Sequence, residues 1–118
     1  MSWSFRWLLA FALTQSVEMG VYAQAHARPR PLRERLAIAF AASGISHPVL
    51  WFFIVPVLTD DAGLRWWTTV AIGEAFAVLS ETALLWAFGV RMPIVWALMA
   101  NATSFLVGLF LYTHFPEW

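Results

Sequence analysis

The sequence predicts an all-α integral membrane protein, built as an antiparallel bundle of four transmembrane helices. Of the 118 residues, 61% are hydrophobic and only 12% are charged, whereas a soluble domain is about half apolar and a quarter charged. Four apolar segments follow one another, each of roughly 19 to 23 residues, which is enough to cross a hydrocarbon core of about 30 Å. The links between them are short, so neighbouring helices should run antiparallel. We expect one membrane domain over residues 1–118, surrounded by lipid.

The four predicted helices follow the apolar segments in order, at about 7–25, 36–58, 66–88 and 93–113. Helices are favoured over strands because lipid cannot satisfy exposed backbone groups, and because the segments lack alternation of polar and apolar residues. The first segment imitates a secretory signal, with Arg6 before the apolar run and the small residues Ala23 and Ala25 where cleavage would occur. Glu18 interrupts that run, and cleavage would place an arginine cluster outside, so we expect the segment to be retained.

Arginines set the expected orientation, since the chain has seven Arg and no Lys. With both termini outside, five arginines lie inside and two, Arg6 and Arg65, lie outside. Because cytoplasmic loops carry the excess of basic residues, we expect both termini outside a cell membrane, most simply the bacterial inner membrane. The inside arginines could also contact anionic lipid; they are Arg28, Arg30, Arg33, Arg35 and Arg91.

Four ionisable residues fall within the apolar segments: Glu18, His47, Glu74 and Glu81. A charged group at the bilayer centre costs about 2.5–3.5 kcal/mol even on a lenient insertion scale. Glu18, His47 and Glu81, together with Asn101 of the last segment, share a layer about 6 Å thick if the helices span the bilayer. Glu74 and Glu81 lie on one face of their helix, about 10 Å apart. We expect Glu18, His47, Glu81 and Asn101 to meet inside the bundle, with Glu74 at the outer end.

Further polar residues share these faces and are expected to support the cluster. Tyr22 lies one turn after Glu18, and Ser43 lies one turn before His47. Asn101 and Ser104 share a face of the last helix. Pro48 cannot donate a backbone hydrogen bond, so the carbonyl of Gly44 is released and a kink is expected there. For every one of these polar residues, the alternative role is to hold helices together by hydrogen bonding.

Charge balance indicates what such a cluster could bind. Three carboxylates cannot all stay charged in a low dielectric unless they share protons, pair with a protonated His47 or bind a cation. Imidazole with carboxylates suits Zn²⁺, Fe²⁺ or Mn²⁺ better than Ca²⁺. A divalent metal ion is thus one cofactor to expect, with Glu18, His47 and Glu81 as principal ligands and Glu74 as a further one. The absence of Cys excludes thiolate sites, and no His-Glu-x-x-His motif is present.

Three function classes remain. The first is a buried proton or divalent-cation site that serves transport or energy coupling. The second is an accessory subunit whose polar face docks on a larger membrane complex or on another copy of the chain. The third is an intramembrane metal-dependent enzyme, which is least favoured because no nucleophile–base or cofactor motif is present, and no catalytic residue is assigned. A net charge of zero gives no reason to expect a nucleic-acid partner.

Overall fold

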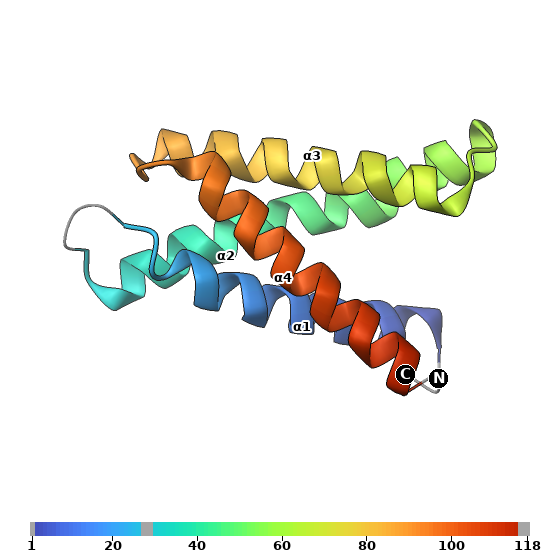
Figure 1. Ribbon diagram of the computed structural model, residues 1–118, viewed down its shortest axis with the longest axis horizontal. Helices are drawn as coiled ribbons and strands as arrows, with labels where there is room; N and C mark the ends of the chain where they lie inside the picture. Colours follow the sequence, from blue (N-terminus) through green and yellow to red (C-terminus); the bar gives the residue numbers. More distant parts are fainter. Residues whose placement is uncertain (1, 27–29, 116–118) are drawn as a thin grey trace.

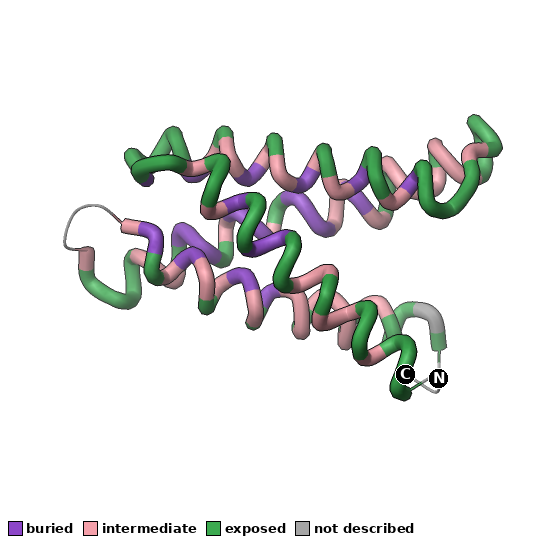
Figure 2. The backbone as a smooth tube through the Cα atoms, in the orientation of Figure 1, coloured by how far each residue is buried: buried purple, intermediate pink, exposed green. Residues whose placement is uncertain are grey.

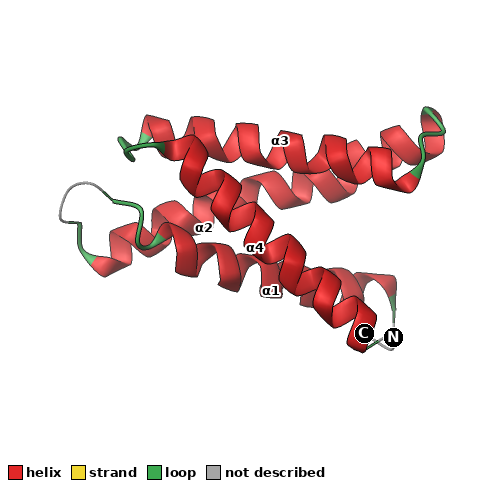
Figure 3. Ribbon diagram, viewed as in Figure 1, coloured by secondary structure: helices red, strands yellow, loops and turns green. Residues whose placement is uncertain are grey.

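The computed structural model describes residues 2–26 and 30–115, and within this part the chain is all-helical, with four α-helices and no strand (Figure 3). A π-helical continuation in two short segments, η1 and η2, follows the second helix. The elements in order are α1 Trp3–Tyr22, α2 Leu32–Val49, η1 Leu50–Ile54, η2 Val57–Asp61, α3 Trp66–Ala87 and α4 Pro93–His114.

The ends of the helices follow from local capping chemistry. α1 begins before the predicted residue 7 because the Oγ of Ser2 caps it, accepting a hydrogen bond of 3.3 Å from the backbone N–H of Phe5. It ends at Tyr22, before the predicted residue 25. α4 begins with Pro93, where the missing N–H costs nothing. After α3, Gly89 takes up a positive φ of 74°, which glycine adopts without strain, and the chain turns.

The second helix is longer than the predicted 36–58, since it runs without a break from Leu32 to Asp61. Both π-helical stretches begin just after a proline: η1 begins two residues after Pro48, and η2 begins directly after Pro56. A proline ring clashes with the carbonyl four residues earlier and removes its donor. Wider π-helical turns are one way for a helix to accommodate an interruption of its hydrogen-bond ladder. The irregularity expected at Pro48 is therefore present as a π-helical turn.

The four helices contact one another in a closed ring: α1 with α2, α2 with α3, α3 with α4, and α4 with α1. Helices α1 and α3 are therefore diagonal partners. α4 crosses the other helices obliquely, whereas a simple bundle would have it run alongside them (Figure 1). The start of α1, the end of α4 and the α2–α3 link lie at one end of the molecule, and the other two links lie at the opposite end.

The hydrophobic core lies near the α1–α2 link and is packed largely from small residues. Buried positions gather where the helices face each other (Figure 2). Ala39 and Ala42 of α2 and Ala97 and Ala100 of α4 are all fully or almost fully buried. Small residues let helices approach closely, as they do in membrane bundles. The outer faces instead expose large apolar side chains, among them Phe53, Leu79, Trp86 and Leu106, each more than 60% exposed.

Three helices are long and apolar enough to cross a membrane: Leu32–Asp61, Trp66–Ala87 and Pro93–His114. α1 is not among them. It has 20 residues, but it carries Gln15, Ser16 and Glu18 within its second half.

Two arginines, Arg30 in the α1–α2 link and Arg35 in the first turn of α2, cap the carboxyl ends of two helices. Arg35 donates through Nη1 to the carbonyl of Ala23 at 2.7 Å, just after α1, and Arg30 donates through Nη2 to the carbonyl of Phe88 at 2.7 Å, just after α3. Cations stabilise the negative end of a helix dipole. The basic link thus has a structural role that the sequence-based prediction of topology did not include. Arg28, which that prediction counted, lies outside the described residues.

Candidate functional site

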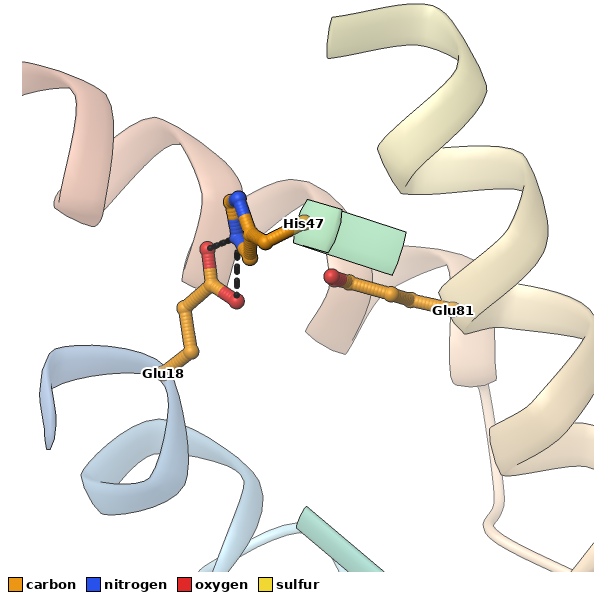
Figure 4. A group of neighbouring side chains, drawn as sticks. All are labelled: Glu18, His47 and Glu81. Atoms are coloured by element: carbon orange, nitrogen blue, oxygen red, sulfur yellow. Dashed lines mark hydrogen bonds and ion pairs between the residues drawn. The ribbon is translucent and has the colours of Figure 1, made fainter. Parts of the chain in front are cut away.

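Three ionisable side chains from three helices point toward one another in the interior (Figure 4). Glu18 comes from α1, His47 from α2 and Glu81 from α3, and each offers one possible ligand atom within 4.8 Å of the others. The two carboxylates are fully buried and His47 is 8% exposed. We call Glu18, His47 and Glu81 the interior cluster.

One half of the interior cluster is a contact between His47 of α2 and Glu18 of α1, which becomes an ion pair when the imidazole is protonated. His47 Nε2 lies 3.4 Å from each carboxylate oxygen of Glu18. The hydroxyl of Ser104 on α4 donates to Glu18 Oε1 at 2.7 Å. The imidazole therefore faces both oxygens symmetrically, and a third helix fixes the orientation of the carboxylate.

The other half is a carboxylate held by three donors. Glu81 Oε2 accepts hydrogen bonds from Tyr22 Oη at 2.5 Å and from Asn101 Nδ2 at 2.6 Å. Glu81 Oε1 accepts one from Ser46 Oγ at 2.5 Å. The donors come from α1, α4 and α2, so Glu81 of α3 is tied to every other helix. Buried polar groups that are fully paired in this way specify one arrangement of the helices.

The residues singled out in the sequence reach different places. Tyr22, Asn101 and Ser104 all bond to carboxylates of the interior cluster. Ser43 is fully buried, but its hydroxyl has no hydrogen-bond partner among the described residues. Glu74, expected at the outer end of the cluster, lies outside this hydrogen-bond network. It lines a groove between α3 and α4.

Ser46 is a functional candidate that the sequence analysis missed in favour of Ser43. Consecutive residues on a helix point about 100° apart. Because α2 lies between α1 and α3 in the ring of contacts, His47 can face Glu18 while Ser46 faces Glu81. The signal was present in the adjacent pair Ser46-His47, but a search for residues on the face of His47 passes over the one directly before it.

Comparison with known proteins gives no further guidance. No family model, no curated protein and no solved structure matches this chain.

The remaining acceptor capacity decides what the interior cluster could hold. A carboxylate oxygen has two lone pairs. Glu81 Oε2 already accepts two hydrogen bonds, whereas Oε1 accepts one. Glu18 Oε2 faces only His47. One oxygen of each carboxylate thus keeps a lone pair that could take up a proton or an ion, and His47 Nε2 could join it by releasing Glu18. The hydroxyl and amide donors keep both carboxylates in place.

Proposed function

We propose that this chain is a four-helix membrane protein whose interior cluster holds either protons or one divalent cation, serving transport or energy coupling. The observation that carries this proposal is the convergence of Glu18, His47 and Glu81 from three helices, with both carboxylates fully buried. Ionisable side chains are costly to bury within membrane-spanning helices, and where they occur they commonly mark an ion pathway or a proton relay.

Membrane insertion is supported by the distribution of apolar surface. Three helices meet the length and hydropathy of a membrane span, and large apolar side chains cover the outer faces. α1 can serve as the fourth span because its most polar side chains turn inward: Gln15 is 6% exposed, and Glu18 and Tyr22 are fully buried. Ser16 is exposed, but its hydroxyl donates to the carbonyl of Ala12 in the same helix. The α1–α2 and α3–α4 links, which carry Arg30 and Arg91, lie at one end, and the start of α1 and the end of α4 lie at the other. We therefore place the termini outside the cell membrane.

The charge of the interior cluster can be neutralised by either of two kinds of occupant, a divalent cation or protons. A neutral imidazole with two carboxylates carries two negative charges, which one divalent cation neutralises. Two protons do the same, for example one on His47 and one on Glu81. Since no Lys or Arg side chain contacts these carboxylates among the described residues, the positive charge has to arrive from outside the cluster. Exchange of protons for an ion is what a coupled transport site requires.

The donor set narrows the choice of ion. One nitrogen and two carboxylate oxygens suit Zn²⁺, Mn²⁺ or Fe²⁺, whereas Ca²⁺ takes six to eight oxygens. Glu18, His47 and Glu81 would be the ligands. Tyr22, Ser46, Asn101 and Ser104 would orient them by hydrogen bonding, which is the usual role of groups around a metal site.

The test is the melting temperature of the purified full chain across pH, with and without Zn²⁺, Mn²⁺ or Ca²⁺. Wild type is compared with Glu18→Gln, His47→Ala and Glu81→Gln, and with Glu34→Gln as a control at an exposed carboxylate. An ion that binds the folded state raises its stability by mass action. We expect Zn²⁺ or Mn²⁺ to raise the melting temperature of wild type and Glu34→Gln but not of the three cluster variants. If only protons bind, the cluster variants should instead lose the pH dependence of wild type.

The opposite outcome is equally clear. If wild type and all variants respond alike to every ion and pH, the interior cluster only holds the helices together. In that case an accessory subunit that docks on a larger membrane complex becomes the better description.

A further inference from the structure

A groove of about 390 Å³ lies between α3 and α4, outside the hydrogen-bond network of the interior cluster. This is within the size range of small-molecule sites, which is about 300–1,000 Å³. Its walls are apolar and aromatic, with Trp67 and Val78 from α3 and Leu98 and Phe105 from α4. Glu74 and Asn101 are the polar residues in this lining.

Glu74 is the unusual member of this wall. Its side chain is half-buried, and no described residue forms a hydrogen bond or an ion pair with it. The carboxylates of the interior cluster, in contrast, have two or three such partners each. A carboxylate in an apolar wall is costly unless something neutralises it. The groove therefore places a carboxyl group, which has no hydrogen-bond or ion-pair partner among the described residues, beside an apolar space.

We propose that this groove binds a monovalent organic cation, an ammonium group carried on an apolar or aromatic body, with Glu74 as the counter-ion. Trp67 and Phe105 provide aromatic surface for the body of the ligand and for its charge, since cations are attracted to the faces of aromatic rings. Ligand pockets are mostly apolar, and a few precisely placed polar or charged groups determine which ligand they bind. The proposal does not depend on whether the interior cluster binds ions.

Two other occupants fit the groove less well. A hydrated metal ion needs several oxygen or nitrogen ligands, and this lining has few. A phospholipid chain would satisfy the apolar walls but not the carboxylate. Glu74 lies about 4 Å along α3 from the midpoint of the helix, so a head group would have to descend about 11 Å into a hydrocarbon half-layer of about 15 Å.

Asn101 places the groove directly beside the interior cluster. Its side chain lines the groove and also donates hydrogen bonds to Glu81 Oε2 at 2.6 Å and to the carbonyl of Ala97 at 2.9 Å. It forms the polar partition between the two sites. A cation held at Glu74 would thus be separated from Glu81 by one amide group.

The experiment uses the purified full chain in non-ionic detergent, repeated in nanodiscs of neutral lipid. The probes are benzyltrimethylammonium and neopentylbenzene, which have the same shape but differ in the charged nitrogen. Binding is measured by saturation-transfer NMR and by calorimetry. The variants are Glu74→Gln, which removes the charge, and Ala102→Phe, which fills a small-residue position in the groove wall. Glu34→Gln, at an exposed carboxylate on another helix, is the matched control.

We expect wild type and Glu34→Gln to bind the cation at least about tenfold more tightly than Glu74→Gln does. The neutral isostere should bind wild type and Glu74→Gln equally, and Ala102→Phe should bind neither probe. The proposal is overturned if wild type binds no cation, or if it binds both probes with equal affinity. Because that comparison uses wild type alone, it decides the matter even if Glu74→Gln does not fold.

Discussion

Tyr22 and Glu81 join the two diagonal helices of the bundle. The hydroxyl of Tyr22 on α1 donates to Glu81 Oε2 on α3 over 2.5 Å, and both side chains are fully buried. In the ring of helices, α1 packs against α2 and α4 but not against α3. This hydrogen bond therefore crosses the interior and connects helices that the backbone packing leaves apart.

Replacing Tyr22 with Phe should destabilise the protein by about 1–3 kcal/mol, because a buried hydrogen bond to a carboxylate is lost while the ring remains. The measurement is chemical unfolding in detergent. Tyr112→Phe removes a hydroxyl of the same kind at a side chain that is 70% exposed, and we expect it to change stability by less than about 0.5 kcal/mol. Equal effects of the two substitutions would mean that the diagonal bond contributes nothing.

The two serines of α2 should respond in opposite ways. Ser46→Ala removes a donor to Glu81 Oε1 and should lower stability by about 1–2 kcal/mol. Ser43→Ala removes a buried hydroxyl that has no partner among the described residues, so it should be neutral or stabilising. The check is the melting temperature of the two variants side by side. A larger loss for Ser43→Ala than for Ser46→Ala would contradict this arrangement of α2.

Arg35 and Arg33, in the first turn of α2 beside the α1–α2 link, offer another matched pair. Arg35→Gln should cost about 1–2 kcal/mol, since Arg35 caps α1 at the carbonyl of Ala23 and also bonds to the carbonyl of Arg30. Arg33→Gln removes the same charge from an exposed side chain and should cost less than about 0.5 kcal/mol. Unfolding free energies of both variants give the comparison. Identical losses would show that only net charge matters in this link.

His26, in the same link, should make stability fall in mild acid. Burial lowers the pKa of its imidazole below the ordinary value, and the cations of Arg30 and Arg35 lower it further. The unfolded chain then binds a proton that the folded chain does not, so stability is lost as the pH falls below about 6.5. His26→Gln should lose less stability than wild type between about pH 8 and pH 5.5. Parallel pH profiles for the two proteins would exclude this contribution.

Much of the fold follows from the sequence because its determinants are local. Apolar length sets α3 and α4, and Pro93 marks the start of α4 where it was predicted. The start of α1 was placed too late because the cap at Ser2 lies outside the apolar run. The π-helical stretches after Pro48 and Pro56 were only anticipated as a kink, since the sequence indicates where a ladder breaks but not how it is repaired.

The site was harder to predict because it depends on which face each helix turns to its neighbours. Common depth in the membrane brought together Glu18, His47 and Glu81 in the sequence analysis, and these three converge in the structure. Depth alone could not separate Glu74 from Glu81, which share a helix face. The oblique crossing of α4 gives them different surroundings: Asn101 bonds to Glu81, and Glu74 lines the groove.

The most direct test of the proposed ion or proton site is infrared difference spectroscopy of the carboxyl groups in the protein reconstituted in lipid. We expect a C=O band from a protonated carboxyl group that disappears when the pH is raised or when Zn²⁺ or Mn²⁺ is added. The band should be absent or shifted in Glu18→Gln or Glu81→Gln and unchanged in Glu34→Gln. Carboxylate bands that ignore both pH and metal ions in wild type would contradict the proposal.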